Sequence, residues 1–258
     1  MSMQFETINE LTLKVTTTGR STLYTKTGAF IGGECFGNSM NYNFDKVLLG
    51  PQQNGAHHSG LHAFGQQMMR RITGENLPLT KVESSGDNVL YFANKAQHIL
   101  IYKLEQGETL SIESENILAF TGDCKYSVKF MAQGVVSQKG LATSTLTGVG
   151  PEAYVAILVD GNPIVLSNVD NGALLTTDPD ATVCWIGTEN DDPEIKMNVT
   201  WKNFIGQSSG ESWVYQWNGY KRVTVILQPN ERDASGVSVS MDGGVAGSQP
   251  TRQVSRLY

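Results

Sequence analysis

The feature that most constrains this chain is a regular alternation of apolar and polar residues in short segments. Leu11, Leu13 and Val15 alternate with threonine and lysine, and residues 213–217 and 223–227 repeat the pattern. Successive side chains of a strand point to opposite faces, so the alternation predicts strands with one buried face. Asp–Gly or Asn–Gly pairs, which favour tight turns, interrupt segments 154–166 and 213–227. We therefore predict a complete hairpin in each of these two segments.

Composition supports an all-β fold. Glycine accounts for 27 of the 258 residues, and charged residues for only 17%. Short strands with frequent turn signals predict antiparallel sheets packed as a sandwich or a barrel-like fold. No apolar segment reaches the roughly 18 residues of a membrane-spanning helix. The first residues lack the basic and apolar regions of a signal peptide, so we expect a soluble protein.

One segment departs from the strand pattern. Its apolar residues are spaced by three and four, they are preceded by Ser59, and they are followed by Gly74. These apolar residues are Leu61, Phe64, Met68 and Ile72. The spacing places them on one face of a helix, so we predict a short helix near residues 60–72.

A glycine-bounded pattern recurs along the chain and predicts three internal repeats. Each copy begins at a glycine, runs through alternating residues to a second glycine, and enters an apolar strand. We expect residues 1–232 to form one all-β domain, followed by a Gly- and Ser-rich tail at 233–258. The expected repeats are 70–130, 135–190, and a third formed jointly by 5–36 and 202–228.

The shared third repeat has a structural consequence. It predicts that the strand region 5–31 pairs with the strand region 205–227 and closes the molecule. Closure would remove exposed sheet edges, which otherwise invite aggregation.

The same segments carry a family resemblance. Residues 70–76, Arg-Arg-Ile-Thr-Gly-Glu-Asn, resemble the "basic residue, apolar, x, Gly-Glu-Ser" signature of a bacterial family named after its fungal mitochondrial member, altered-inheritance-of-mitochondria protein twenty-four. Residues 140–154 and 210–223 resemble two later glycine-punctuated elements of that family. The resemblance covers roughly residues 5–228.

This resemblance implies a fold similar to the trp RNA-binding attenuation protein, a β prism with threefold pseudo-symmetry. Mitochondrial members are linked to inner-membrane organisation, and the resemblance brings no catalytic residues or cofactor with it. The likeness to an RNA-binding fold concerns the fold alone. Two features depart from the family pattern: Asn218-Gly219-Tyr220 replaces a Gly-x-Gly, and residues 51–65 look like an insertion.

Charge and cysteine content narrow the function classes. Lys and Arg total 19 and are scattered, and the net charge is −6. Nucleic-acid binding needs several aligned cations, so this class is disfavoured. The three cysteines, an odd number without a CxxC motif, argue against a disulfide framework or zinc ribbon. We therefore expect a reducing, cytoplasmic location; peripheral membrane association stays open.

His57, His58 and His62 form the most suggestive metal-binding cluster. His58 and His62 would share a helix face if the helix began early, and imidazole suits Zn, Cu or Ni. No aspartate or glutamate occurs between Asp45 and Glu75, so a third ligand is missing nearby. An exposed polar loop is the simpler interpretation.

Cys35, Cys124 and Cys184 fall at similar places in the expected repeats. A three-thiolate site on a pseudo-threefold axis is conceivable. Equivalent core positions filled by a small apolar residue explain the pattern more simply.

Two further groups are candidates for ligand or interface contacts. Trp213, Tyr215 and Trp217 would line one face of a strand, as a stacking platform or, more commonly, as core or interface residues. Arg70, Arg71 and Glu75 flank the predicted helix end and could form salt bridges to a neighbouring unit or an anion site.

Three hypotheses for function follow. The first is a non-enzymatic structural or scaffold protein that forms homo-oligomers or binds a protein partner through sheet faces or edges. The second is a ligand-binding module that uses the aromatic face or the prism interior. The third is a metal-dependent enzyme centred on His57, His58 and His62. Burial of the tryptophans would favour the first hypothesis over the second.

Overall fold

The computed structural model describes residues 2–37, 40–49, 77–130, 142–197 and 213–229. Nineteen strands and one 3-10 turn, Ser114–Asn116, occupy this part of the chain. All strand pairs are antiparallel. The predicted all-β, sandwich-like class is therefore confirmed. The expected helix near 60–72 and the tail at 233–258 lie outside the described residues.

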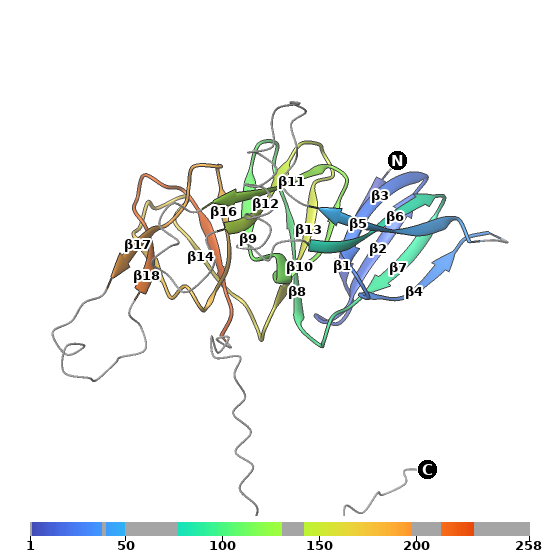
Figure 1. The fold of residues 1–258 in the computed structure, drawn as a ribbon, viewed down its shortest axis with the longest axis horizontal. Coiled ribbons are helices and arrows are strands. Elements are labelled where there is room, and N and C mark those ends of the chain that lie inside the picture. The colour runs from blue at the N-terminus through green and yellow to red at the C-terminus, as the bar shows by residue number, and fades with distance from the viewer. Residues whose placement is uncertain (1, 38–39, 50–76, 131–141, 198–212, 230–258) are drawn as a thin grey trace, which may run out of the picture.

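The described strands form three successive units along the long axis (Figure 1). The first unit follows the N-terminal strand β1 (Ser2–Thr7) and contains β2 (Leu13–Thr18), β3 (Arg20–Lys26), β4 (Phe30–Cys35), β5 (Tyr42–Leu49), β6 (Leu77–Ser85) and β7 (Asn88–Phe92). The middle unit contains β8 (His98–Lys103), β9 (Thr109–Ile112), β10 (Ile117–Thr121), β11 (Cys124–Phe130), β12 (Ala142–Gly148) and β13 (Tyr154–Val159). The third unit contains β14 (Ile164–Ser167), β15 (Leu175–Thr177), β16 (Thr182–Gly187), β17 (Glu194–Met197), β18 (Trp213–Trp217) and β19 (Thr224–Leu227).

Every unit has the same topology. Its first, sixth and third strands form one half-sheet, and its second, fifth and fourth strands form another. In the first unit these are β2-β7-β4 and β3-β6-β5, and the other two units repeat this order. The two half-sheets of a unit pack face to face, so each unit is a small sandwich.

Neighbouring units share sheets. β3 of the first unit pairs with β10 of the middle unit, and β9 of the middle unit pairs with β16 of the third. The result is four sheets: sheet A (β1-β2-β7-β4), sheet B (β5-β6-β3-β10-β13-β8), sheet C (β11-β12-β9-β16-β19-β14) and sheet D (β15-β18-β17). Sheets B and C each cross a unit boundary, so the units are joined by backbone hydrogen bonds.

Three apolar cores fill the spaces between successive sheets. Leu13, Leu90 and Phe92 represent the core between sheets A and B, and Leu110 and Ile157 the core between B and C. Leu175, Trp185 and Trp217 represent the core between C and D. Strand alternation creates these layers: in β2 the three inward residues are buried and the intervening ones are not.

The predicted closure of the molecule is wrong for the described residues. β1 to β4 pair within sheets A and B, whereas β18 and β19 pair within sheets D and C. The first and third units lie at opposite ends of the molecule (Figure 1). The expected repeats begin within units: 70–130 spans β6 to β11, and 135–190 starts before β12. The prism geometry that the resemblance implies stays a prediction.

Both predicted hairpins are also wrong in their pairing, although their strands exist. β13 lies in sheet B and β14 in sheet C, while β18 lies in sheet D and β19 in sheet C. The turns at Asp160–Gly161 and Asn218–Gly219 therefore connect different sheets. Gly161 has a φ of +88°, which fits its place in a tight connection.

Candidate functional site

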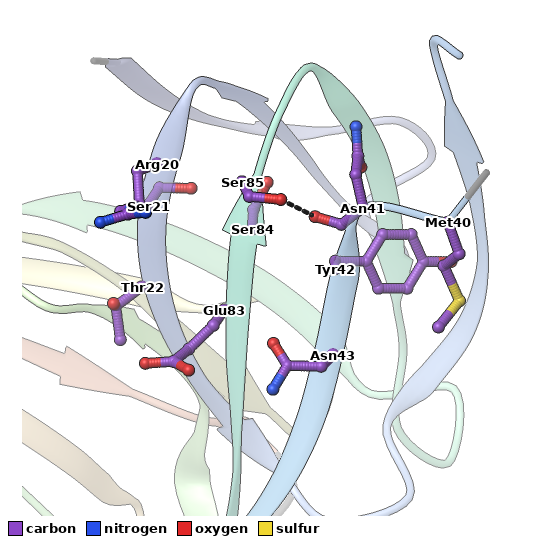
Figure 2. Close-up of a pocket in the computed structure, with 10 residues that line it drawn as sticks. All are labelled: Arg20, Ser21, Thr22, Met40, Asn41, Tyr42, Asn43, Glu83, Ser84 and Ser85. Atoms are coloured by element: carbon purple, nitrogen blue, oxygen red, sulfur yellow. Dashed lines mark hydrogen bonds between the residues drawn. The ribbon is translucent and has the colours of Figure 1, made fainter. Parts of the chain in front are cut away.

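A concavity lies on the first unit (Figure 2). We call it the β3 groove; its volume is about 520 Å³. Three adjacent strands build it, because Ser21 of β3 is opposite Ser84 of β6, and Tyr42 of β5 is also opposite Ser84. The lining residues are Arg20, Ser21, Thr22, Met40, Asn41, Tyr42, Asn43, Glu83, Ser84 and Ser85.

The wall of the β3 groove is held by hydrogen bonds to the Asn41 carbonyl. The backbone N–H of Ser85 donates to this oxygen at 2.9 Å, and the Ser85 hydroxyl donates to it at 3.0 Å (Figure 2). Gly86 leaves space for the Asn41 side chain, since a Cβ there would lie 2.2 Å from Asn41 Nδ2. These contacts fix Asn41 at the edge of the groove.

A buried polar network lies beside the groove. Asn88 is fully buried, and its amide donates to Ser84 Oγ at 2.7 Å and to the Gly86 carbonyl at 3.2 Å. Thr17 Oγ1 lies 3.0 Å from Ser84 Oγ. Such a network holds β2, β6 and β7 in register, because each member loses hydrogen bonds if a strand shifts.

Two side-chain atoms of the groove residues are unpartnered. Ser21 Oγ and Asn41 Oδ1 are shielded from solvent and have no hydrogen-bond partner among the described residues. A buried acceptor without a partner costs about 1–3 kcal/mol. Because both atoms are shielded from solvent, a ligand in the groove reaches them only if the groove wall moves.

Charges at the groove belong to Arg20 and Glu83. The Lys81 ammonium, hydrogen-bonded to Glu83, lowers the pKa of that carboxyl, and Arg20 lowers it further. Glu83 is therefore a carboxylate at neutral pH. With both signs of charge present, the groove suits a polar ligand better than a purely anionic one.

A second concavity of about 430 Å³ lies on the other side of Arg20, where the first and middle units meet. Its carboxylates are committed to backbone contacts. Asp123 Oδ2 accepts from the Glu152 N–H at 2.9 Å, and Glu152 Oε2 accepts from the Met3 N–H at 3.1 Å. These bonds fasten β1 to the turn before β13, so we interpret the acidic residues as structural.

The structure places the predicted aromatic platform inside the third core. Trp217 is fully buried and its indole N–H donates to the Asp191 carbonyl at 3.0 Å; Tyr215 is 5% exposed. For these two residues the core interpretation is confirmed and the open stacking platform is wrong. The Trp213 side chain lies outside the described part.

The cysteines do not form the conceivable three-thiolate site. Cys35 ends β4 in sheet A, whereas Cys124 and Cys184 belong to sheet C. All three are free thiols, and no group of three potential metal-ligating residues occurs within the described ranges. Burial raises the pKa of the Cys124 thiol to about 11, and burial also raises that of Cys184. Both buried thiols are therefore poor nucleophiles at neutral pH.

The other predicted site residues, His57, His58, His62, Arg70, Arg71 and Glu75, lie outside the described residues. The structure instead brings together Arg20, Ser21, Asn41 and Glu83, which the sequence analysis missed. No motif links these residues, because the groove arises from strand pairing across long sequence separations. A shared polar character at neighbouring strand ends is a weak signal in a Thr- and Ser-rich chain.

Comparison with known proteins now identifies the family. The family model described as "Mitochondrial biogenesis AIM24" matches residues 5–230. The chain belongs to this family. No curated protein matches it at a significant level.

Among solved structures, this AIM24-family chain is similar to a Streptococcus pyogenes protein determined by X-ray crystallography. The two share 18% sequence identity with a TM-score of 0.59, over 89% of this chain and 94% of that one. At this identity the likeness supports the fold alone. Within the described residues, no helix is long and apolar enough to span a membrane.

Proposed function

We propose that this protein is a non-enzymatic scaffold that self-associates through the edges of its sheets. The observation that carries the proposal concerns the two ends of the row of three units: among the described strands, each end has an edge strand with exposed apolar side chains. Ile31 is 60% exposed on β4 of the first unit, and Leu174 is 58% exposed beside β15 of the third. An open edge presents unpaired backbone groups, which favours pairing with another strand.

Further exposed apolar side chains lie near the same ends of the molecule. On the first unit they include Phe36, Met40 and Phe44, and on the third unit they include Ile164 and Val169. Large apolar patches on a surface often mark sites of protein association. The proposal places this assembly in a reducing compartment such as the cytoplasm, which suits three free thiols.

Light scattering after size-exclusion chromatography tests the scaffold proposal. Over a hundredfold concentration range, the mass should exceed the 28.1 kDa of one chain and rise with concentration. Self-association through charged surfaces would weaken strongly with salt, whereas self-association through apolar edge strands should persist at 0.5 M NaCl. A constant mass of one chain under all conditions contradicts the proposal.

The β3 groove supports a second candidate function, the binding of a small polyhydroxylated ligand. Its hydroxyls would donate to the Glu83 carboxylate and accept from the Arg20 guanidinium, since both residues line the groove. Calorimetric titration with a panel of monosaccharides tests this candidate, with Arg20→Ala and Glu83→Ala as variants. Binding that is unaffected by both variants would exclude the groove as its site.

The metal-dependent enzyme stays a prediction for His57, His58 and His62, which lie outside the described part of the chain. Metal analysis of the purified protein tests it directly. Stoichiometric Zn, Cu or Ni that is lost in a His58→Ala, His62→Ala double variant would favour this hypothesis over the scaffold.

A further inference from the structure

The junction between units occurs twice in this chain and has the same construction each time. The second strand of one unit pairs with the third strand of the next: β3 with β10, and β9 with β16. The matched residues are Thr25 with Ala119 in the first junction and Ile112 with Cys184 in the second. A junction of this type therefore needs one free second strand and one free third strand.

A bulge identifies equivalent residues in the third strands. Each third strand skips one residue when it pairs with the sixth strand of its unit, and the skipped residues are Ile31, Leu118 and Val183. The residues after the bulge, Gly32, Ala119 and Cys184, are therefore equivalent.

The second strands align in the same way. The inward residues to compare in the second strands are Thr25, Ile112 and Thr177. The following third strands begin at Phe30, Ile117 and Thr182, and the number of positions between each pair is the same. Thr177 of β15 is therefore equivalent to the residues that pair with Ala119 and Cys184.

Among the described strands, one half of this junction is unpaired at each end of the molecule. β15, the second strand of the third unit, is an edge strand whose neighbour among the described strands is β18. β4, the third strand of the first unit, is an edge strand whose described neighbour is β7. β4 and the β15-containing sheet D lie at opposite ends of the long axis (Figure 1), so one chain cannot pair them with each other.

The residues skipped at the bulges differ in burial, as expected if each packs into the core of the unit before its own. Leu118 is fully buried and belongs to the core of the first unit, and Val183 is 3% exposed and belongs to the core of the middle unit. Each thus packs into the core of the unit before its own. Ile31 belongs to the first of the described units and is 60% exposed.

The three cores also differ in which units contribute side chains to them. The core between sheets A and B includes Leu118 and Ala156 from the next unit, and the core between B and C includes Val183 and Ile226 from the next unit. In the described part of the chain, the buried members of the third core all come from the third unit itself. Among the described residues, the third core is thus the one that receives no side chain from a following unit.

We propose that β15 of one chain pairs with β4 of a second copy, which extends the row of units from chain to chain. Equivalence sets the register: Thr177 faces Gly32, Thr176 faces Gly33 and Leu175 faces Glu34 of the next copy. Sheet D of one copy and sheet A of the next then form one continuous sheet. Sheet B is continuous across the first junction in the same way. Ile31 packs against the third core, as Leu118 and Val183 do against theirs.

This inference rests on the scaffold proposal and specifies its interface. The contact is heterologous, since two different surfaces meet, so it produces a ring if the rotation closes and a filament if it does not. The space beside Gly32 is open, because nothing lies within 4 Å of a Cβ placed there.

Disulfide trapping tests the register with one substitution. The junction extends to Gly187 opposite Thr109, and the equivalent pair between copies is Cys35 and Leu174. Antiparallel partners have Cα atoms about 4.5–5.5 Å apart, within the range of a disulfide. Leu174→Cys should therefore form a ladder of cross-linked chains with the native Cys35 under mild oxidation.

Two matched controls accompany this variant. Leu174→Cys combined with Cys35→Ser should lose the ladder, and Val165→Cys should not form one, although Val165 is similarly exposed at 53% on edge strand β14. Cys124 and Cys184 are buried and should not take part.

A pair of glutamate variants tests the apolar contact. Ile31→Glu should weaken self-association about 10- to 100-fold, the effect of burying one large aliphatic side chain. Leu48→Glu is the control, because Leu48 is 63% exposed on β5, which has no place in the junction. Both variants should keep the wild-type melting temperature of the isolated chain.

The outcomes separate the two proposals. A constant single-chain mass for the wild type overturns both the scaffold and the junction. Oligomers without a Leu174→Cys ladder, or oligomers that Leu48→Glu disrupts and Ile31→Glu does not, overturn the junction alone. Cross-linking of Leu174→Cys to a different protein in place of a second copy also overturns it.

Discussion

At the residue scale, the polar side chains of the core matter as much as the apolar ones. Asn88, Ser84 and Thr17 share one network in the first unit, and Asn168 plays a similar part in the third. The Asn168 amide donates to the Ala173 and Lys221 carbonyls, and its Oδ1 accepts from the Val223 N–H at 2.8 Å. Each residue ties together segments that no local pattern connects.

Replacement of Asn168 by alanine should therefore destabilise the third unit. Its side chain makes three hydrogen bonds in a fully buried position, and their partners would be left unsatisfied. We expect a loss of about 2–4 kcal/mol in the free energy of unfolding. Urea denaturation measures this loss, and Asn171→Ala on the exposed turn is the matched control.

Buried thiols predict a loss of stability at alkaline pH. Burial raises the pKa of Cys124 to about 11, while an unfolded thiol keeps a value near 9. Between these values the unfolded chain loses the proton and the folded chain retains it, so stability present below pH 9 falls as the pH rises. The slope contributed by Cys124 approaches 1.36 kcal/mol per pH unit.

The variant Cys124→Ala isolates this contribution. Its unfolding free energy, measured by urea denaturation from pH 8 to 11, should fall less steeply than that of the wild type. Cys35→Ala, at a partly exposed site, is the control. Parallel pH profiles for Cys124→Ala and the wild type would contradict the assignment.

At the scale of elements, connections between sheets demand close approach of the backbone. A Cβ at Gly219 would lie 2.4 Å from the Gly172 carbonyl oxygen, so only glycine fits where the β18–β19 and β14–β15 connections meet. Gly219 was expected as a hairpin turn residue. Its role is instead to let two connections pass each other.

Gly219→Ala should consequently separate these connections and destabilise the third unit by about 1–3 kcal/mol. Thermal unfolding measures the effect. Gly37→Ala is the control, since a Cβ at Gly37 would have nothing within 4 Å. Equal melting temperatures for the two variants would show that the connections can move apart at little cost.

At the scale of the whole molecule, shared sheets couple the units. Leu118 belongs to a strand of the middle unit but packs in the core of the first. Repeat proteins of this kind gain stability from interfaces between neighbours as well as from each repeat. Damage at one junction should therefore spread to both units that meet there.

Leu118→Ala tests this coupling. The cavity should cost about 2–5 kcal/mol, and hydrogen exchange should accelerate in β2 and β7 of the first unit as well as in β10. Leu158 of β13 is also fully buried in the same core, so Leu158→Ala should likewise accelerate exchange in both units. Faster exchange confined to β10 would show that the units unfold independently.

Several features followed from the sequence because they depend on local physics. Alternation in residues 11–16 determined β2, and the apolar segments at 154–159 and 223–227 determined β13 and most of β19. The all-β class and a repeated architecture were predictable for the same reason. The β3 groove was not, since Ser21 and Asn41 lie on either side of β6, which is far along the chain from both.

Pairing and repeat phase were decided by tertiary structure alone. A tandem repeat read from sequence has no marked beginning, so a period starting at β6 looks as valid as one starting at β2. A period that starts at β6 makes the two ends of the chain share one repeat, and this is why the sequence suggested closure within the molecule. The packed sandwich selects the repeat that starts at β2, because β2 to β7 bury a common core. Among the described strands, this leaves β4 and β15 at the edges of their sheets. The sequence by itself determined which segments become strands; long-range packing decided which strands meet.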